Sequence, residues 1–547
     1  MRTVEPIRAY LYFRPGHPAG SARSVATFHR LTVVPCDDTS CCGGFDREIV
    51  ADHETRYRVV LEPCSRRKDA RETHFYKAHR EPETTVSNFE SQFRSQSVTI
   101  GNSGIQLLFL GGLGSAGSAT CIVLAHGDSA IMIDCGVTVA LLEHDTDKDE
   151  FEGTGEVLPG IYPEFDLIKQ SGLNIAAIFV THAHLDHYGG LPEYLSRDSL
   201  APHPPIYSGR FTTEIIAHHL NENDIPRHSV SLPVLQENQT VEVGPFKVKA
   251  LPVFHSVPGS LGFAVWLKGA EDERAIVFTG DMKCSLESVS DLFDTIAVLG
   301  GIGPVKLLLC DCTNATREGL TELEASVEGG FLNAIMAAPG RVFVSLFSTH
   351  INRIRRLAAL SNLTRKRLSL LGQSFEGPLD ALDATGVTIS FQRNPEGAQI
   401  IAIAGCQANE TSTAWRLSQG DQVEGIRIVT GDTIVISALP IPGRGAAVSA
   451  MIKGFRACGA HVIVDNGYPE GIYGPNISRE AVHVSGHGSA HDIKAVIEAT
   501  EPKYILPYHC GRKEAVQAAE IALSSSVFHL TDERIVLVEA NGTIINI

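Results

Sequence analysis

The chain has 547 residues, of which 43% are hydrophobic, and its formal net charge at pH 7 is −17. This length allows about three or four domains with their own cores, and no apolar run approaches the roughly 18 residues that a membrane-spanning helix needs. The acidic balance argues against broad, sequence-independent attachment to nucleic acid, although a local basic channel is compatible with it. The first residues lack the apolar stretch of a secretory signal, and the twelve cysteines are dispersed, so we expect a cytoplasmic protein.

Residues 1–97 form a compositionally distinct extension. They carry 15 basic and 13 acidic side chains, a balance of +2, so the remainder of the chain carries −19. We expect a small, partly ordered appendage with short strands, and a role in recruiting a partner. Its cysteines and histidines follow no strong metal-binding pattern, so a structural zinc site is a weaker reading than plain cysteines. The residues concerned are Cys36, Cys41, Cys42, Cys64, His29 and His53.

The glycines at 112–117 read G-L-G-S-A-G and fit the pattern G-x-G-x-x-G, with Asp134 near the distance expected of a ribose-binding acid. The apolar runs at 119–124 and 130–133, however, predict two strands joined by a turn at 126–128. Because no helix is predicted after the glycines, a dinucleotide-binding reading fails. The glycines are expected to form a turn that borders the active site.

The seven residues 181–187 read T-H-A-H-L-D-H and directly follow a buried strand predicted at 175–180. His182 and His184 are two apart on an extended segment, so their side chains project to the same side and suit one ion. Asp186 and His187 lie further round the loop and suit a second ion. Neutral imidazole and carboxylate are zinc ligands, so the motif predicts a site for two metal ions rather than a set of structural histidines.

The same pattern, a strand followed by a potential ligand, recurs three times. His255 follows an alternating stretch at 246–253, Asp281 follows the apolar run 275–278, and His509 follows 504–507. Loops at strand ends are held by a rigid sheet, and catalytic groups collect there. These residues are therefore candidates for the remaining ligands.

The order of these motifs resembles the metallo-β-lactamase superfamily, in which H-x-H-x-D-H is joined by a distant His, a bridging Asp and a last His. The resemblance implies an α/β protein with a four-layer αββα fold and two Zn²⁺ ions, with Mn²⁺ or Fe²⁺ as alternatives. It implies that Asp134 orients the ligand loop by hydrogen bonding. It further implies that His182, His184 and His255 hold one ion, that Asp186, His187 and His509 hold the other, and that Asp281 bridges them.

More than two hundred residues separate Asp281 from His509, so an α/β domain is inserted between them. The segments L-L-L-C-D-C-T-N at 307–314, V-H-V-S-G-H-G-S at 482–489 and P-Y-H at 507–509 resemble the motifs of the β-CASP nucleases. T-G-D-M-K at 279–283 and P-I-P-G at 440–443 resemble ribonuclease J in particular. The predicted domains are an extension at 1–97, a metallo-β-lactamase domain at 98–325 and 481–547, and a β-CASP domain at 326–480.

The resemblance implies a metal-dependent ribonuclease acting on single-stranded RNA, with 5′ to 3′ exonuclease and endonuclease modes both open. Asp186 is expected to take part in catalysis, and His487, held and charged by Asp311, is expected to supply a proton or stabilise the phosphate. A structural imidazole that caps the next helix is the weaker reading of His487. Its glycine-rich setting favours contact between backbone amides and an anion. The expected substrate contacts are Ser485, Gly488, Ser489 and Arg353.

Several segments depart from the family. Three segments differ from the usual residues where substrate ends are held: H-C-G-R at 509–512, G-C-Q-A-N-E at 405–410 and Gln373. We expect the catalytic core to close at 535–547 without the family's C-terminal dimerisation domain, so a homodimer remains open but is not expected to form through that domain. A thioesterase or lactonase is disfavoured by the inserted block from Asp311 to His487. A DNA-directed β-CASP nuclease is disfavoured by His509, and a non-catalytic RNA-binding protein by the intact ligand set.

Overall fold

The computed structural model describes residues 8–12, 45–52, 55–61, 73–80, 98–101, 103–139, 161–197, 202–269, 274–468, 477–525, 530–538 and 541–547. The chain divides into two compact units, Met1–Asn88 and Phe89–Ile547, so the division falls earlier than the predicted boundary at 97. The first unit contains an antiparallel sheet in the order β1-β4-β3-β2. Its strands are β1 (Arg8–Tyr12), β2 (Phe45–Asp52), β3 (Thr55–Leu61) and β4 (Thr73–Arg80). The six cysteine and histidine positions considered for a structural zinc lie outside the described residues.

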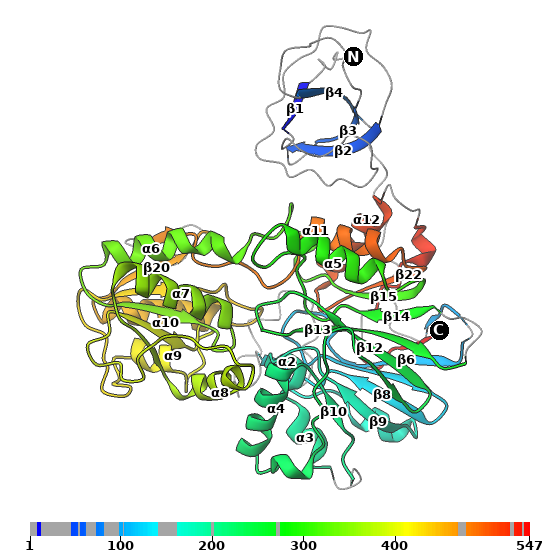
Figure 1. Ribbon diagram of the computed structural model, residues 1–547, viewed down its shortest axis with the longest axis horizontal. Coiled ribbons are helices and arrows are strands. Elements are labelled where there is room, and N and C mark those ends of the chain that lie inside the picture. The colour runs from blue at the N-terminus through cyan, green and yellow to red at the C-terminus, as the bar shows by residue number, and fades with distance from the viewer. Residues whose placement is uncertain are drawn as a thin grey trace. The chain divides into compact units, whose positions relative to one another are not determined.

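The second unit consists of two lobes, and the larger lobe contains two sheets (Figure 1). The seven-stranded sheet has the order β10-β9-β8-β7-β6-β23-β5, and the six-stranded sheet has the order β11-β12-β13-β14-β15-β22. The first comprises β5 (Val98–Thr99), β6 (Ile105–Gly111), β7 (Cys121–His126), β8 (Ser129–Ile133), β9 (Asn174–Phe179), β10 (Ile206–Tyr207) and β23 (Ile544–Asn546). The second comprises β11 (Thr240–Val243), β12 (Phe246–Pro252), β13 (Leu261–Leu267), β14 (Ala275–Phe278), β15 (Val305–Asp311) and β22 (Tyr504–Tyr508).

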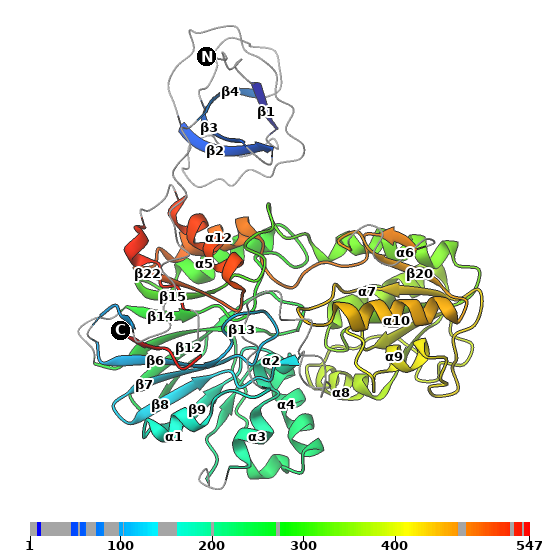
Figure 2. The same ribbon diagram turned by 180° about the vertical axis from the view of Figure 1, so that it is seen from behind.

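Alternation along the strands explains why the two sheets stack with helices outside them. Leu107 and Phe109 of β6 share one buried cluster with Phe263 of β13, whereas Leu108 of β6 belongs to a different cluster on the opposite face. Successive side chains of a strand point to opposite faces, so each sheet has one face toward the other sheet and one toward helices. The outer clusters include α1 (Asp166–Gln170), α3 (Leu191–Leu195) and α4 (Arg210–Glu222) on one side, and α5 (Ser290–Gly300), α11 (Ala490–Thr500) and α12 (Arg512–Leu523) on the other. The predicted αββα fold is confirmed, and Figure 2 shows it from behind.

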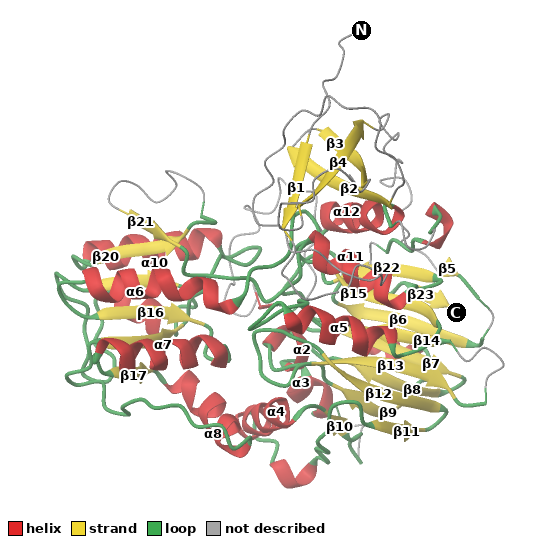
Figure 3. Ribbon diagram, turned by 45° about the horizontal axis from the view of Figure 1, so that its top comes forward, coloured by secondary structure: helices red, strands yellow, loops and turns green. Residues whose placement is uncertain are grey.

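The smaller lobe is the predicted inserted α/β domain. Its sheet has the order β17-β18-β16-β19-β20-β21 and is parallel throughout. Helices α6 (Val327–Ala337) and α7 (Ile351–Thr364) pack on one face, and α9 (Thr413–Ser418) and α10 (Gly445–Ala457) pack on the other. Figure 3 shows α6, α7 and α10 beside this sheet. The strands are β16 (Val342–Leu346), β17 (Leu368–Leu371), β18 (Ile400–Ala404), β19 (Thr433–Ile436), β20 (His461–Asp465) and β21 (Ile477–Glu480).

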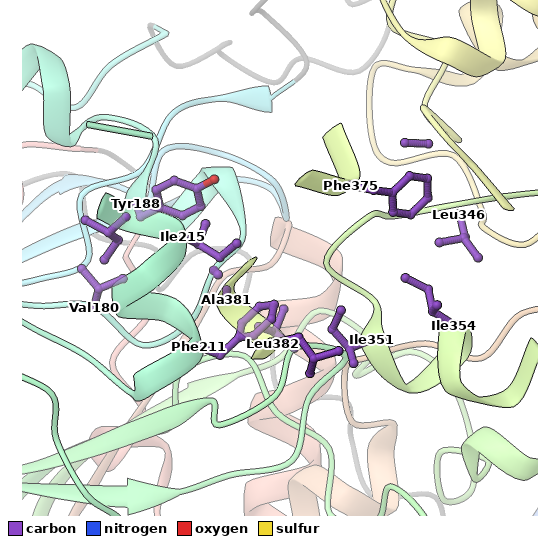
Figure 4. Close-up of a cluster of buried hydrophobic side chains, with 14 of the residues drawn as sticks. Val180, Tyr188, Phe211, Ile215, Leu346, Ile351, Ile354, Phe375, Ala381 and Leu382 are labelled. Carbon is purple, nitrogen blue, oxygen red and sulfur yellow. The ribbon is translucent and has the colours of Figure 1, made fainter. Parts of the chain in front are cut away.

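One hydrophobic cluster continues from the larger lobe into the smaller one. Phe211 and Ile215 of α4 lie beside Ala381 and Leu382 of α8 (Glu376–Ala384), as Figure 4 shows. Ile351 of α7 is buried in the same cluster. The two lobes therefore share apolar packing in addition to the chain crossings near 311–327 and 480–490.

The glycine-rich segment has the predicted conformation. β6 ends at Gly111, and the next regular element in this described stretch is the strand β7, so a helix does not follow the glycines. β7 and β8 pair with His126 opposite Ser129, which leaves Gly127 and Asp128 as the hairpin turn. The dinucleotide-binding reading is thus excluded on the fold. In the part of the chain that the structure describes, none of the helices is both long and apolar enough to span a lipid bilayer.

Candidate metal centre

The H-x-H-x-D-H motif lies at the carboxyl end of β9. His182 and His184 belong to the extended segment that follows the strand, and His184 has φ −105° and ψ 145°. Asp186 and His187, predicted as part of a loop, instead lie on the one-turn helix α2 (Leu185–Tyr188). This turn changes the direction of the chain between the two pairs of side chains, so each pair faces a different set of partners.

The first group of ligand atoms comes from His182, His184, His255 and Asp281, whose candidate atoms all lie within 4.8 Å of one another. Nδ1 of His184 is 3.0 Å from Nε2 of His182 and 3.2 Å from Nε2 of His255. Residue 255 is remote in sequence, and its approach follows from the pairing of β12 with β13 and of β13 with β14. The fold thus assembles three imidazole nitrogens and one carboxylate around a single point.

The second group comes from Asp186, His187, His509 and again Asp281, with the same 4.8 Å limit. Oδ2 of Asp281 is 3.2 Å from Nε2 of His187 and 3.7 Å from Nε2 of His182, so this carboxylate lies between the groups. Nε2 of His509 is 3.3 Å from Oδ2 of Asp186. The seven residues expected as ligands are therefore brought together in the two sets that the resemblance implied.

Unsatisfied polar atoms indicate that these residues fit metal ions. Nε2 of His187 and Oδ1 of Asp281 are buried and have no hydrogen-bond partner among the described residues. Buried polar atoms in folded proteins are normally paired, so an unpaired imidazole nitrogen and an unpaired carboxylate oxygen in one site fit a bound cation. The donors are nitrogen and oxygen, which suits Zn²⁺ and also Mn²⁺.

Each ligand imidazole has one ring nitrogen held by a neighbouring group. Nδ1 of His187 lies 2.8 Å from Oδ2 of Asp134, which fixes the proton on Nδ1 and leaves Nε2 for a ligand. Thr181 accepts from Nδ1 of His182 and donates to Asp134 through the same hydroxyl. Nδ1 of His255 donates to the carbonyl oxygen of Gly486 at 2.8 Å. The orienting role expected of Asp134 thus has the geometry it requires.

Two residues of the centre have left-handed backbone conformations, which residues other than glycine rarely adopt. Asp134 has φ 60° and His509 has φ 56°. Such strain persists only where the surrounding structure holds it, and it concentrates at functional sites. Here Asp134 is held by His187 and by the backbone N–H of Thr181, while His509 is held by Thr313, whose hydroxyl donates to the His509 carbonyl.

Burial and neighbouring charges keep the three imidazoles of the first group neutral and the Asp281 carboxylate ionised. Burial lowers the pKa of His182 and His255 well below the usual value for histidine, and burial lowers the pKa of His184 to about 4. Burial acts to raise the pKa of Asp281, but the facing imidazoles of His187 and His509 outweigh it and hold that pKa well below its usual range. Neutral imidazoles and an ionised carboxylate are the forms that bind metal.

Asp311 and His487 lie beside the same carboxylate. Nδ1 of His487 is 2.8 Å from Oδ2 of Asp311, and its Nε2 is 3.9 Å from Oδ2 of Asp281. Burial alone would lower the pKa of His487, but the carboxylates of Asp311 and Asp281 raise it to about 9. The helix that follows is capped by Ser489 with Asp492 and not by His487, so the capping reading of His487 does not hold.

Three of the four expected substrate contacts have internal roles instead. Arg353 is 1% exposed, and its guanidinium contacts Glu324 and backbone carbonyls inside the protein. Gly488 is buried and donates its N–H to Met282, and Ser489 forms the capping box of α11. In this structure the buried side chains of Arg353 and Ser489 and the N–H group of Gly488 thus have partners inside the protein. Ser485 alone is half-buried.

The residues that orient the metal ligands and hold residues 484–486 are not predicted from the sequence. Thr181 and Thr313 adjoin recognised motif residues, so their hydroxyls were identifiable as possible partners of the neighbouring imidazoles. Glu324 and Lys283 are both 0% exposed in their side chains and 3.6 Å apart. Glu324 has no periodic or spacing signal in the sequence, and the T-G-D-M-K segment that contains Lys283 carries no information about its partner. Only the fold brings them together.

Comparisons with known proteins agree with this architecture. A model described as the metallo-beta-lactamase superfamily matches residues 114–307, and one described as the ribonuclease J beta-CASP domain matches residues 339–455. A ribonuclease J of Sinorhizobium meliloti is 28% identical over 416 residues, which cover 73% of this chain and 66% of that protein. A ribonuclease J of Synechocystis is 28% identical over 457 residues, covering 81% of this chain and 66% of that protein. The chain thus spans just under two thirds of the length of these two relatives.

A crystal structure of a protein of unknown function from Enterococcus faecalis V583 is similar in fold. It superposes with a TM-score of 0.52 at 15% sequence identity, covering 81% of this chain and 99% of the other. At that identity the likeness concerns the fold alone. The two models match in the order of the two lobes, so the chain contains a metallo-β-lactamase domain and a β-CASP domain of the ribonuclease J type.

Proposed function

We propose that this protein is a metal-dependent ribonuclease that hydrolyses phosphodiester bonds in single-stranded RNA. The observation that carries the proposal is the convergence on Asp281. Two groups of metal ligands share this carboxylate, and the Asp311–His487 pair lies against it. A small-molecule hydrolase on the same ligand set has no evident use for the inserted lobe. We further propose Zn²⁺ as the resident metal, with Mn²⁺ as the alternative, and the cytoplasm as the compartment.

The chain's own residues supply proton transfer and orientation. Two divalent cations in such a site activate water and stabilise the negative charge that develops on a phosphoryl group. Asp311 holds Nδ1 of His487, so the proton available for transfer is the one on Nε2 of that imidazole. The carboxylates of Asp311 and Asp281 raise the pKa of His487 in the metal-free chain and so favour its protonated form, from which Nε2 can donate to the leaving oxygen of the cleaved bond. Asp186 belongs to the second group together with His509, whose Nε2 lies 3.3 Å from Oδ2 of Asp186.

The loop at 485–486 supports a role in holding the substrate phosphate. Among the described residues, the backbone N–H groups of Ser485 and Gly486 meet no acceptor. Consecutive free amides form anion-binding concavities in proteins, and a glycine allows close approach of the anion. We therefore assign the phosphate contact to these two amides, in place of Gly488 and Ser489.

The test is RNA cleavage by the metal-loaded protein, with single-stranded RNA that carries a 5′-monophosphate, a 5′-triphosphate or a 5′-hydroxyl group. Cleavage is expected, and release of mononucleotides with a preference for the monophosphate would establish the exonuclease mode. Asp186→Ala and His187→Ala should abolish cleavage, whereas Asp166→Ala, a change of an exposed carboxylate on α1, should not. Undiminished cleavage by both ligand variants would overturn the proposal.

A further inference from the structure

Arg353, Glu324 and Lys283 form a buried charged network, and the metal centre does not include it. Glu324 lies on the 3₁₀ turn Glu324–Ser326 where the chain enters the smaller lobe, Arg353 lies on α7, and Lys283 follows β14. Both guanidinium-to-carboxylate contacts from Nη2 of Arg353 are 3.1 Å, and Nζ of Lys283 is 3.6 Å from Glu324. Three parts of the chain that are distant in sequence thus meet in the interior.

The side chains of Arg353 and Lys283 also bind consecutive carbonyl groups of residues 484–486. These residues, along which the chain returns from the smaller lobe, are called the return segment below. Nη2 of Arg353 donates to the carbonyl of Val484 at 3.1 Å, and Nζ of Lys283 donates to the carbonyl of Ser485 at 3.2 Å. The next carbonyl, that of Gly486, accepts the 2.8 Å hydrogen bond from Nδ1 of His255. Three successive peptide groups are therefore fixed, two by the buried cations and the third by a metal-ligand imidazole.

Residue 486 has little free space around it, so its backbone and the His255 ring cannot shift independently. A Cβ atom at position 486 would come within 2.6 Å of Cε1 of His255, so backbone and imidazole are already in close contact. A small displacement of the segment consequently moves the ring or breaks its hydrogen bond. Because trans peptide groups point their C=O and N–H in opposite directions, the same contacts direct the N–H groups of Ser485 and Gly486 away from the cations.

Energetics favour a positioning role over a purely stabilising one. Desolvation of buried charges costs several kcal/mol per ion, and apolar residues of similar size are often at least as stable in their place. Two buried cations here face one carboxylate, and the remaining acceptors are backbone carbonyls together with the Ser437 hydroxyl and the His483 ring. What the charges supply beyond stability is a fixed direction for those carbonyls.

We propose that Arg353, Glu324 and Lys283 are positioning residues that set the backbone at 484–486 and thereby aim His255 at the first metal group. The catalytic importance of this positioning rests on the proposed function, but metal binding tests the positioning itself independently of RNA cleavage. Orienting partners of metal ligands typically contribute 10- to 100-fold in metal affinity or activity. An effect of that size on one of the two ions is the expected signature.

The experiment compares Arg353→Met with Arg356→Met in the full-length protein. Arg356 is on the same helix and pairs with two carboxylates, those of Glu287 and Glu328, but it makes no contact with the return segment among the hydrogen bonds and ion pairs of the described residues. Zn²⁺ is titrated into metal-stripped protein against a chromophoric chelator, and thermal unfolding is measured alongside. Arg353→Met should weaken one of the two Zn²⁺ ions about 10- to 100-fold and leave the other near the wild-type affinity. Arg356→Met should change neither.

A double-mutant cycle with His255→Ala identifies the route of the effect. In the His255→Ala background the ring is absent, so Arg353→Met should produce no additional loss of Zn²⁺ affinity. Arg353→Lys, which keeps the charge but cannot reach all the acceptors at once, serves if Arg353→Met does not fold, and it should show a smaller loss of the same ion. Equal weakening of both ions, additive losses in the cycle, or an unchanged affinity in folded variants would overturn the inference. Absence of RNA cleavage by wild-type protein would refute the ribonuclease proposal and leave this result standing.

Discussion

The behaviour of single imidazoles explains how the centre is prepared for metal. In His187 and His255 one ring nitrogen is engaged by a fixed acceptor, a carboxylate in the first and a carbonyl in the second, and the other nitrogen faces the site. The partner thus selects the tautomer before any ion arrives. Asp134 acts on His187 and, through the hydroxyl of Thr181, on His182, so one carboxylate reaches both ligand groups.

Replacing Asp134 tests this orientation. In Asp134→Asn the side-chain amide cannot accept from both the His187 imidazole and Thr181 as the carboxylate does, so we expect metal affinity to fall about 10- to 100-fold. The measurement is Zn²⁺ affinity by chelator competition, with Asp128→Asn in the exposed hairpin turn as the control. Wild-type affinity in Asp134→Asn would show that the hydrogen bond does not orient the ligand.

Replacing His487 separates proton transfer from metal binding. We expect His487→Gln to retain both ions, because the two main ligand groups do not include this residue, and to lower kcat about 10²- to 10⁴-fold. Metal content and steady-state kinetics on single-stranded RNA measure the two effects. Loss of an ion would instead indicate that the third possible group, formed by Asp281, Asp311, His487 and His509, binds metal.

At the scale of residues, a role in the site could be predicted where the residue directly follows a strand or a recognised motif in the sequence. The ligands follow strands, and strand ends meet at one edge of a sheet, so the sequence carries their convergence. Arg353 was predicted to contact RNA because a segment pattern places it near the site but carries no information about burial. Glu324 has no pattern of its own, and the T-G-D-M-K segment that contains Lys283 does not indicate its partners, because these come from distant parts of the chain.

At the scale of secondary-structure elements, apolar patterns predicted the strands, and the long spacing between Asp281 and His509 predicted the inserted domain, but neither predicted the junction between the lobes. The contact of α4 with α8 depends on how the two lobes dock, and nothing in either helix sequence specifies its partner. The helices approach closely there, since a Cβ atom at Gly377 of α8 would come within 3.3 Å of the His218 ring on α4. The placement of Asp186 and His187 on a single helical turn was likewise unpredicted, because four residues give no periodic signal.

Truncation of a junction side chain tests whether the lobes are held together by this packing. Phe211 is 1% exposed and lies beside α8, so Phe211→Ala should lower the free energy of unfolding by about 3–5 kcal/mol and separate the unfolding of the lobes into two transitions. Phe293→Ala, at a 48% exposed position on α5, should change the free energy by less than about 0.5 kcal/mol. Calorimetry measures both, and an unchanged single transition for Phe211→Ala would argue against a packed junction.

At the scale of the whole molecule, the concentration of buried histidines should make the metal-free protein sensitive to acid. Burial lowers the pKa of His182, His184, His255 and His350 in the folded chain below the value of about 6.5 that applies when it is unfolded. Below pH 6.5 the unfolded chain therefore binds protons that the folded chain does not, and each such group lowers stability by up to about 1.4 kcal/mol per pH unit. His187 and His487 act in the opposite sense, because their raised pKa values stabilise the folded chain below pH 6.5.

The stabilisation from His187 and His487 is lost as the pH rises through their folded pKa values, which for His487 is about 9. The metal-free protein should consequently be most stable near pH 6.5 to 7 and less stable at both pH 5 and pH 9. Urea denaturation in the presence of a chelator at these three pH values measures this. Adding Zn²⁺ at 100 times its dissociation constant should raise the free energy of unfolding by about 2.7 kcal/mol for each ion bound at neutral pH, provided that only the folded chain binds it. The increase should shrink at pH 5, because protons compete for the same imidazole nitrogens. A gain independent of pH would mean that the ion is bound by carboxylates alone, which would contradict the two histidine-containing groups around Asp281.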